Sequence, residues 1–336
     1  MEAMLYDKLD NGRVRCGICS HLCMIRPGER GLCSVRENRD GKLVSLVYPK
    51  LVAAGIDPIE KKPIFHFKPG SKAYSIATAG CNFKCDFCQN ADIAQMDLAD
   101  TRYIPGRHMN PQDIVDQAVE AGCESIAYTY TEPTVFFEVA FETARIAGSK
   151  GIGNVFVTNG YMSPKALEKI LPFMDAANVD LKAFNDAFYR RYCGARLAPV
   201  TQTIETMKQA GVLVEVTTLL IPGLNDDPGE LSDLAGYLAG TVGKDTPWHI
   251  SRFHPCHRMT DRPVTPLSSM KTAWEAGKNA GLHYIYLGNV PGSGYENTLC
   301  HSCGALLIER HGYRIRSFFK QAPACPSCGT PCAGRY

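Results

Sequence analysis

The 336-residue sequence contains no apolar run that approaches the roughly 20 residues of a membrane-spanning helix. Its first residues, Met1 to Arg15, are polar and lack the apolar stretch of a secretory signal peptide. An excess of one charge is also missing, because 36 Lys and Arg residues nearly balance 34 Asp and Glu residues and leave a net charge of +2. Without a strong overall field, nucleic acid and membrane surfaces are not expected as main partners. We therefore expect a cytoplasmic protein that binds neither.

Internal repeats, low-complexity tracts and a phosphate-binding glycine loop are absent as well. The glycine-rich stretch from Gly148 to Gly153 follows an expected helix and precedes an expected strand. A dinucleotide-binding loop has the reverse order, so helix capping and a turn explain these glycines. The length suggests one large catalytic domain with appendages.

Cysteine, by contrast, is abundant. A reducing compartment disfavours disulfides, so metal binding is the expected use of 15 cysteines. Three clusters account for most of them, at 16–33, 81–88 and 300–328. The others are expected to be small buried hydrophobes or incidental thiols, and we assign them no role: Cys123, Cys193, Cys256 and Cys332.

The central cluster has only three cysteines, Cys81, Cys85 and Cys88, in a C-x3-C-x2-C spacing. Closed zinc and iron–sulfur sites normally use four protein ligands, whereas a catalytic metal site keeps one position open. A four-iron cluster on these thiolates would have one iron free for another ligand. A zinc site completed by a distant residue is disfavoured, because a strand-like apolar run, Tyr74 to Ala77, enters the loop directly.

The loop from Gly80 to Cys88 resembles the signature of radical S-adenosylmethionine (SAM) enzymes. In that family SAM chelates the fourth iron of a [4Fe-4S] cluster, and an electron from the cluster cleaves SAM to a 5′-deoxyadenosyl radical. The radical abstracts hydrogen from an unactivated carbon, a reaction that side chains cannot perform. The resemblance implies a [4Fe-4S] cluster, SAM and an electron donor such as flavodoxin or ferredoxin.

Between Lys72 and about Val290, short β-branched or aromatic runs alternate with helical patterns, which indicates βα units around a parallel sheet. Strands are expected at 73–78, 125–129, 154–158, 177–181, 213–219 and 248–253, with a plausible seventh at 283–287. Helices are expected at 111–120, 135–147, 164–171, 200–210, 228–238 and 267–280. These units resemble the α/β partial (βα)6 barrel of the radical SAM superfamily (71–292), between a cysteine-rich N-terminal segment (1–70) and a four-cysteine tail (293–336).

The resemblance assigns SAM contacts to residues that follow successive strands, where such barrels place their active sites. In many members of the family a Gly-Gly-Glu-Pro segment binds the methionyl amino group, and its place is taken here by Tyr130-Thr131-Glu132-Pro133. Glu132 would accept a hydrogen bond from that ammonium. Asn159 would bind the ribose or the carboxylate. Lys182 would pair with the SAM carboxylate, while Asp180 holds Lys182 or a bound cation.

Two further contacts follow from the resemblance, and the chain also departs from the family pattern. His254, after the sixth strand, would reach the SAM edge of the pocket, and Phe87 would lie near adenine. Tyr130 and Thr131 replace two glycines. Val157 stands where the pyruvate formate-lyase activase pattern has an acid, which puts a monovalent cation site in doubt. Each contact also has a structural alternative. Glu132 could be an acid at a helix N-terminus and Asn159 a turn residue, while Lys182 could be a solvated lysine and His254 a structural histidine.

The C-terminal cluster contains two C-x2-C-G knuckles, separated by an expected hairpin with its turn at His311-Gly312. Glycine after each second cysteine permits the tight turn in which backbone N–H groups face sulfur. We expect a zinc-ribbon or rubredoxin-like site with zinc favoured over a single iron. Its ligands would be Cys300, Cys303, Cys325 and Cys328. The nearby basic residues are expected to form a solvated face of the hairpin: Arg310, Arg314, Arg316 and Lys320.

The N-terminal cluster also offers four thiols, in the order C-x2-C-x3-C-x9-C. Gly28 and Gly31 would ease the turn back. The spacing does not decide between zinc and an auxiliary iron–sulfur cluster. As a site for the radical cluster it is disfavoured, because it has four ligands and no barrel strand precedes it. The four residues are Cys16, Cys19, Cys23 and Cys33.

Over nearly its whole length, the chain resembles the radical SAM enzymes of the AmmeMemoRadiSam system, in the pyruvate formate-lyase-activase-like branch. The matching segments are residues 16–23, 57–63, the Cys81 loop through Asn90 (81–90), 128–133 and 297–298. This implies hydrogen abstraction from an unidentified substrate, with Memo-like and AMMECR-like proteins as possible partners. The alternatives are an activase that abstracts hydrogen from a glycine of a glycyl-radical enzyme, and a non-catalytic metal-ribbon binding module.

Overall fold

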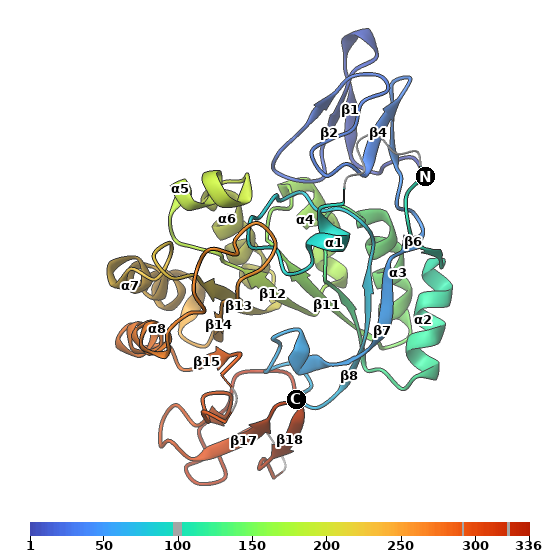
Figure 1. Cartoon of the computed structure of the whole chain (residues 1–336). Coiled ribbons are helices and arrows are strands. Elements are labelled where there is room, and N and C mark those ends of the chain that lie inside the picture. Colours follow the sequence, from blue (N-terminus) through green and yellow to red (C-terminus); the bar gives the residue numbers. More distant parts are fainter. Residues whose placement is uncertain (97–102, 291, 321–322) are drawn as a thin grey trace.

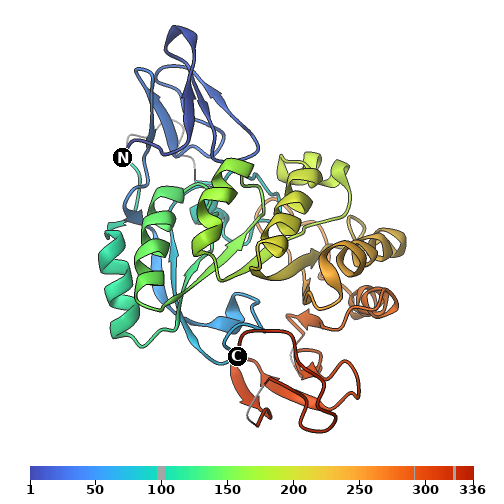
Figure 2. The same cartoon turned by 180° about the vertical axis from the view of Figure 1, so that it is seen from behind.

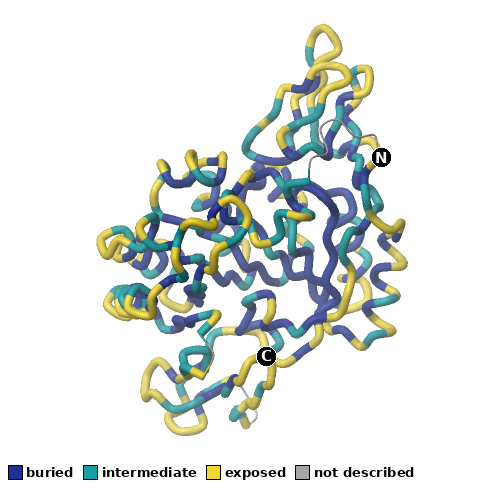
Figure 3. Tube along the Cα trace, in the orientation of Figure 1, coloured by how far each residue is buried: buried dark blue, intermediate teal, exposed yellow. Residues whose placement is uncertain are grey.

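A curved sheet of eight strands forms the centre of the computed structural model, which describes residues 1–96, 103–290, 292–320 and 323–336 (Figure 1). The strand order is β15-β14-β13-β12-β11-β10-β8-β7. Seven neighbouring strands are parallel: β8 (Lys72–Ala77), β10 (Ser125–Tyr128), β11 (Gly153–Thr158), β12 (Ala176–Asp180), β13 (Leu213–Leu220), β14 (Trp248–Arg252) and β15 (Ile285–Gly288). Residues of these strands are mostly buried, as expected for a parallel sheet covered on both faces (Figure 3).

Helices follow the parallel strands, and the longer ones cover the outer face of the sheet, as the view from behind shows (Figure 2). They are α1 (Ala91–Ala94), α2 (Pro111–Glu120), α3 (Phe137–Ser149), α4 (Pro164–Ile170), α5 (Asp186–Phe188), α6 (Leu197–Gln209), α7 (Pro228–Tyr237) and α8 (Leu267–Asn279). In α2, α4 and α7 the N-cap side chain accepts a backbone N–H, and proline follows it in the first turn. Within the described residues, none of the helices is long and apolar enough to span a membrane.

The predicted α/β fold with a parallel sheet is confirmed, with one difference in its strands. The plausible seventh parallel strand is present as β15. An unpredicted strand, β7 (Ala53–Pro58), runs antiparallel along all of β8. Its sequence, Ala-Ala-Gly-Ile-Asp-Pro, lacks a β-branched run and carries glycine and proline, which is why the strand pattern did not indicate it.

The N-terminal cysteines belong to a small lobe at one end of the sheet (Figure 1). Its elements are β1 (Tyr6–Lys8), β2 (Val14–Cys16), β3 (Met24–Ile25), β4 (Arg36–Arg39) and β5 (Lys42–Ser45), while β6 (Lys50–Leu51) pairs with β9 (Arg107–His108). A buried ion pair joins the lobe to α3, because Arg36 Nη2 lies 2.7 Å from Glu138 Oε2. The Ser163 hydroxyl at the start of α4 donates to the Gly17 carbonyl oxygen at 2.6 Å. The lobe is thus attached to the barrel helices.

The C-terminal tail lies at the opposite end of the molecule and contains β16 (Thr298–Leu299), β17 (Leu306–His311) and β18 (Arg314–Ser317) (Figure 1). The prediction that Arg310 is solvated is wrong, because its side chain is buried between tail and barrel. Its guanidinium donates to Thr298 Oγ1 at 2.7 Å and to the Phe65 carbonyl oxygen at 2.9 Å, and lies 4.2 Å from the Phe65 ring centroid. The other three basic residues of the hairpin are exposed, as predicted.

Candidate active site

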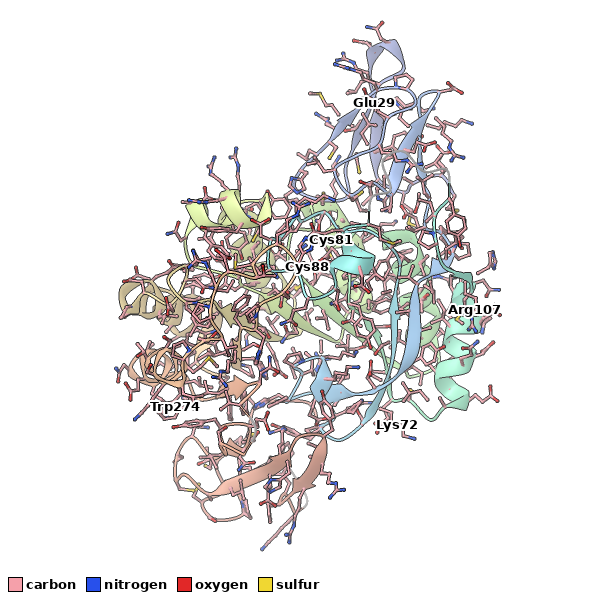
Figure 4. All side chains as sticks on the ribbon, viewed as in Figure 1. Glu29, Lys72, Cys81, Cys88, Arg107 and Trp274 are labelled. Carbon is pink, nitrogen blue, oxygen red and sulfur yellow. The ribbon has the colours of Figure 1, made fainter. Side chains whose placement is uncertain are left out.

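The loops at the C-terminal ends of the parallel strands surround a cavity of about 360 Å³. This is the end at which parallel α/β folds place their active sites. Predicted site residues that line the cavity are Cys81, Cys85, Phe87, Cys88, Glu132, Asn159, Asp180 and Lys182. They come from the loops after β8, β10 and β11 and from the end of β12. Figure 4 shows Cys81 and Cys88 at this end of the sheet.

The three cysteines lie on a loop that the barrel holds firmly. Lys84 N–H donates to the Cys193 carbonyl oxygen at 2.9 Å, and Asp86 N–H donates to that of Tyr192 at 3.1 Å. The Phe83 N–H lies 3.4 Å from Cys81 Sγ. Backbone N–H groups that face sulfur are typical of iron–sulfur sites and tune their potential.

The three thiols of this loop fit a [4Fe-4S] cluster in which three irons have a cysteine ligand and the fourth iron has none. Three soft thiolates suit iron–sulfur ligation and leave one position open. Burial raises the pKa of Cys81 and helps to raise that of Cys88, so metal binding must displace their protons. Within the described chain these three sulfurs do not all lie within 4.8 Å of one another, which a single ion would require.

Glu132 is buried and connects the loops after β10 and β11. Its Oε1 accepts the Thr134 N–H at 3.0 Å and the hydroxyls of Thr134 and Thr158 at 2.6 and 2.7 Å. Its Oε2 accepts the Asn159 N–H at 2.7 Å. Oε2 therefore has more capacity left to accept a donor from a ligand, and Glu132 also positions Asn159.

Lys182 and Asp180 form an ion pair at the cavity wall, with 2.9 Å between Lys182 Nζ and Asp180 Oδ2. Burial opposes the charged ammonium, but the Asp180 carboxylate and the thiolate forms of Cys85 and Cys193 raise the pKa of Lys182 well above its ordinary value. The ammonium lies 5.8 Å from the Phe87 ring centroid. A cation thus stands beside the cysteine loop, and its contact with the SAM carboxylate stays a prediction.

Two asparagines connect the cysteine loop to the loop after β11. The Asn159 side-chain amide donates to Asn82 Oδ1 at 2.8 Å, and Asn159 Nδ2 lies 3.9 Å from Cys81 Sγ. Asn159 Oδ1 accepts the Tyr161 N–H at 3.1 Å. Asn159 is therefore held in place by protein groups on both sides of its amide.

His254 is exposed and does not belong to the residues that line the cavity. On that side, the lining consists of Ser251 from β14 and Asn289 after β15. Asn289 Nδ2 donates to Ser251 Oγ at 3.1 Å. A contact of His254 with SAM stays a prediction.

A charged cluster on the cavity wall was not predicted from the sequence. Lys61, Lys62 and Tyr130 line the cavity. Lys61 Nζ lies 2.7 Å from Asp57 Oδ1, Lys62 Nζ lies 2.6 Å from Asp57 Oδ2, and the Tyr130 hydroxyl donates to Oδ2 as well. Although burial opposes ionisation, these partners hold the pKa of Asp57 well below its usual range. The signal was the charged run from Asp57 to Lys62, which begins in β7 and precedes the first parallel strand, β8.

Tyr130 has a left-handed backbone conformation with φ of 64°. Such a conformation is unusual for a bulky residue and concentrates at functional sites. The Asn90 side-chain amide of the cysteine loop donates to the Tyr130 carbonyl oxygen at 2.8 Å. The Tyr130 ring lies 4.3 Å from Lys62 Nζ, whose pKa is lowered by burial. Tyr130 therefore connects the cysteine loop to the charged cluster.

The predicted C-terminal four-cysteine cluster is present, and its geometry is compact. The four sulfurs lie within 4.8 Å of one another, with Cys300–Cys328 and Cys303–Cys325 separations of 3.6 Å. A tetrahedral ion with metal–sulfur bonds of about 2.3 Å would place its ligands about 3.8 Å apart. Hydrogen bonds from Thr330 lower the pKa of Cys328 to about 6. The site therefore fits one tetrahedral metal ion.

The comparisons with known proteins agree with this site. A family model described as the Radical SAM superfamily matches residues 75–235. An uncharacterized protein of Methanocaldococcus jannaschii is 45% identical, and the match covers 98% of this chain and 97% of that protein. The benzylsuccinate synthase activating enzyme of Thauera aromatica is 24% identical over 46% of this chain and 49% of its own length. A GTP 3′,8-cyclase of Staphylococcus aureus is 25% identical over 45% and 46%. The chain thus spans about half of these last two relatives.

Proposed function

The chain belongs to the radical SAM superfamily, and on that premise we propose that it is an enzyme that cleaves SAM reductively and abstracts hydrogen from a substrate still to be identified. The strongest support is the convergence of predicted residues from separate βα loops on one cavity. A structural metal site would need the cysteine loop alone. Here a cation, a buried carboxylate and two asparagine amides accompany it.

Each proposed SAM contact rests on a group that the cavity presents. Cys81, Cys85 and Cys88 would hold a [4Fe-4S] cluster, which supplies the electron that cleaves SAM when both are bound. Glu132 Oε2 has capacity left to accept the methionyl ammonium, and Lys182 would pair with the carboxylate. Phe87 offers a ring for adenine.

We assign the substrate side of the cavity to the charged cluster. Lys62 Nζ has three N–H donors, and its contacts with Asp57 and Tyr130 use two of them. The third can bind a substrate oxygen, and the Tyr130 hydroxyl lies beside it. This arrangement favours a substrate with an anionic or carbonyl oxygen close to the carbon that loses hydrogen.

We further propose that the enzyme acts in the AmmeMemoRadiSam system, with Memo-like and AMMECR-like partners and a flavodoxin or ferredoxin as electron donor. The sequence segments quoted above support this placement. For the tail we propose zinc, supported by the 3.6 Å sulfur separations. A cytoplasmic location remains an expectation from the sequence.

A glycyl-radical-enzyme activase is the second candidate, and the similarity to the benzylsuccinate synthase activating enzyme favours it. The similarity to GTP 3′,8-cyclase is of the same extent, so these relatives do not distinguish a protein glycine from a small molecule. The proposed oxygen contact with Lys62 and Tyr130 fits both candidates, because a peptide glycine also has a carbonyl oxygen beside the carbon that loses hydrogen.

Anaerobic reconstitution tests the proposed function. The full chain, supplied with iron, sulfide, dithionite and SAM, is expected to form 5′-deoxyadenosine, measured by mass spectrometry. A variant with Cys81, Cys85 and Cys88 replaced by alanine should form none, whereas Cys123→Ala, a buried thiol outside the three clusters, should retain the activity. Product formation by the triple variant would overturn the proposal.

A further inference from the structure

The N-terminal lobe gathers its four cysteines around a second cavity, about the size of one water molecule. Cys16 ends β2, Cys23 directly precedes β3, and the Cys16 N–H donates to the Cys23 carbonyl oxygen at 2.9 Å. Cys19 and Cys33 complete the thiol lining, and apolar side chains supply much of the remaining wall. Such a concentration of thiols in an interior cavity is the donor set of a metal site.

The spacing of these thiols does not fit a single metal ion. Four sulfurs that share one zinc ion at about 2.3 Å leave no room for a water-sized sphere between them. In the lobe such a space exists, and in the described chain only the tail brings three or more ligand atoms within 4.8 Å of one another. Neither the lobe nor the Cys81 loop brings three of its sulfurs within 4.8 Å of one another.

The cavity wall also presents donors that lack an acceptor. Arg36 Nε and Asn82 Nδ2 are buried and have no hydrogen-bond partner in the described part of the chain. Both residues line the cavity, and they are only 1% and 2% exposed. An unsatisfied buried donor costs about 1–3 kcal/mol, so these groups indicate an acceptor that the protein itself does not provide.

Backbone donors face the sulfurs as well. N–H groups of Ile18, His21, Leu32 and Val35 hydrogen-bond to the thiols of Cys16, Cys19, Cys23 and Cys33, respectively. Backbone N–H groups that face sulfur are typical of iron–sulfur sites. With the donors of Arg36 and Asn82, the cavity is lined for a group that carries negative charge on several sulfur atoms.

We propose that this cavity holds an iron–sulfur cluster, ligated by Cys16, Cys19, Cys23 and Cys33. Its four thiolates would occupy every cluster position that a protein can ligate, so that SAM would have no open iron there. Inorganic sulfides would supply the acceptors that Arg36 Nε and Asn82 Nδ2 lack. The proposal rests on the lining of this cavity, which includes Asn82 of the Cys81 loop, and not on the proposed SAM chemistry.

The lobe cluster would lie beside the candidate active site. A Cβ on Gly80 would lie 2.9 Å from the Cys33 carbonyl oxygen and 2.7 Å from Val35 Cγ1, so only glycine fits where the two loops meet. His21 Nε2 lies 2.9 Å from the Asn82 carbonyl oxygen. Asn82 lines the lobe cavity, while its neighbour Cys81 lines the other cavity.

The metal content of the full chain without its Cys81 loop cysteines tests the proposal. We expect the Cys81→Ala, Cys85→Ala, Cys88→Ala variant, reconstituted anaerobically, to retain iron with acid-labile sulfide. Mononuclear iron in the tail would bring no sulfide. Further replacement of Cys23 and Cys33 by serine should remove the sulfide, with circular dichroism as the control for folding.

Iron X-ray absorption on the same triple variant tests the proposal without any substitution in the lobe. Iron–iron scattering supports the cluster. Zinc in the lobe, or a triple variant without labile sulfide, overturns the proposal even if the unaltered chain cleaves SAM. Loss of SAM cleavage with the lobe sulfide intact would instead contradict the proposed function and leave this proposal standing.

Discussion

The two four-cysteine sites differ in the distances between their sulfur atoms and in their exposure. The tail holds its sulfurs within 4.8 Å, and Cys303 and Cys328 are exposed. The lobe spreads its sulfurs around a cavity, with Cys16 and Cys33 buried and unsatisfied donors nearby. Both supply four thiols, so ligand number does not choose the metal. The spacing and the donors around the sulfurs distinguish a single ion from a cluster.

The largest expected effect is loss of the tail fold when its metal is removed. The variant Cys303→Ser, Cys328→Ser should lose zinc and become sensitive to protease in the tail, because structural zinc contributes an apparent 10–16 kcal/mol or so in small domains. Limited proteolysis and elemental analysis measure this, with Ser302→Ala in the same knuckle as the control. Iron and labile sulfide should not change. A tail that resists protease without metal would show that its packing on Phe65 and Tyr286 suffices.

The stability of the lobe is expected to depend on its ion pair with the barrel, whereas the stability of the tail is expected to depend on its metal. Arg36→Met leaves the buried Glu138 carboxylate without its partner, which should lower the free energy of unfolding by about 3–5 kcal/mol. Arg39→Met, which removes an exposed partner of Glu37, is the matched control. Denaturant unfolding of the reconstituted protein measures both. Equal effects of the two variants would contradict the role of Arg36.

The smallest expected effect concerns SAM affinity, which should depend on neither four-cysteine site. Lys182→Met should weaken SAM binding about 10- to 150-fold, because a charge-assisted hydrogen bond is worth about 1.5–3 kcal/mol. Glu132→Gln should weaken it too. The exposed pair Lys271 and Glu275 provides the controls Lys271→Met and Glu275→Gln. Equilibrium binding with an unchanged cluster spectrum checks the prediction, and normal affinity in both cavity variants would exclude these contacts.

The barrel could be predicted because its strands are buried apolar runs and several of its helices begin with a capping residue and proline. The tail interface could not, since nothing in the hairpin pattern distinguishes Arg310, which packs on Phe65 from a distant segment. The strand β7 was missed for a similar reason. Its hydrogen bonds with β8 stabilise residues whose own β propensity is low.

The candidate site was predictable where its residues end barrel strands and not elsewhere. Glu132, Asn159 and Lys182 follow consecutive strands, so the fold brings them together. Asp57 and Lys62 come from a segment before the barrel, and the left-handed backbone of Tyr130 that directs its side chain to them has no sequence signal. Sulfur spacing depends on how loops pack, so the sequence left the metal in the lobe open.

Electron paramagnetic resonance of the dithionite-reduced protein, before and after addition of SAM, tests the central claim most directly. A three-cysteine cluster has an iron that SAM can ligate, and a four-cysteine cluster has none. We predict two signals: one that shifts with SAM and disappears when Cys81, Cys85 and Cys88 are replaced by alanine, and one that SAM leaves unchanged and that the same variant retains. A SAM-sensitive signal that survives in that variant would contradict the assignment of SAM to the Cys81 loop.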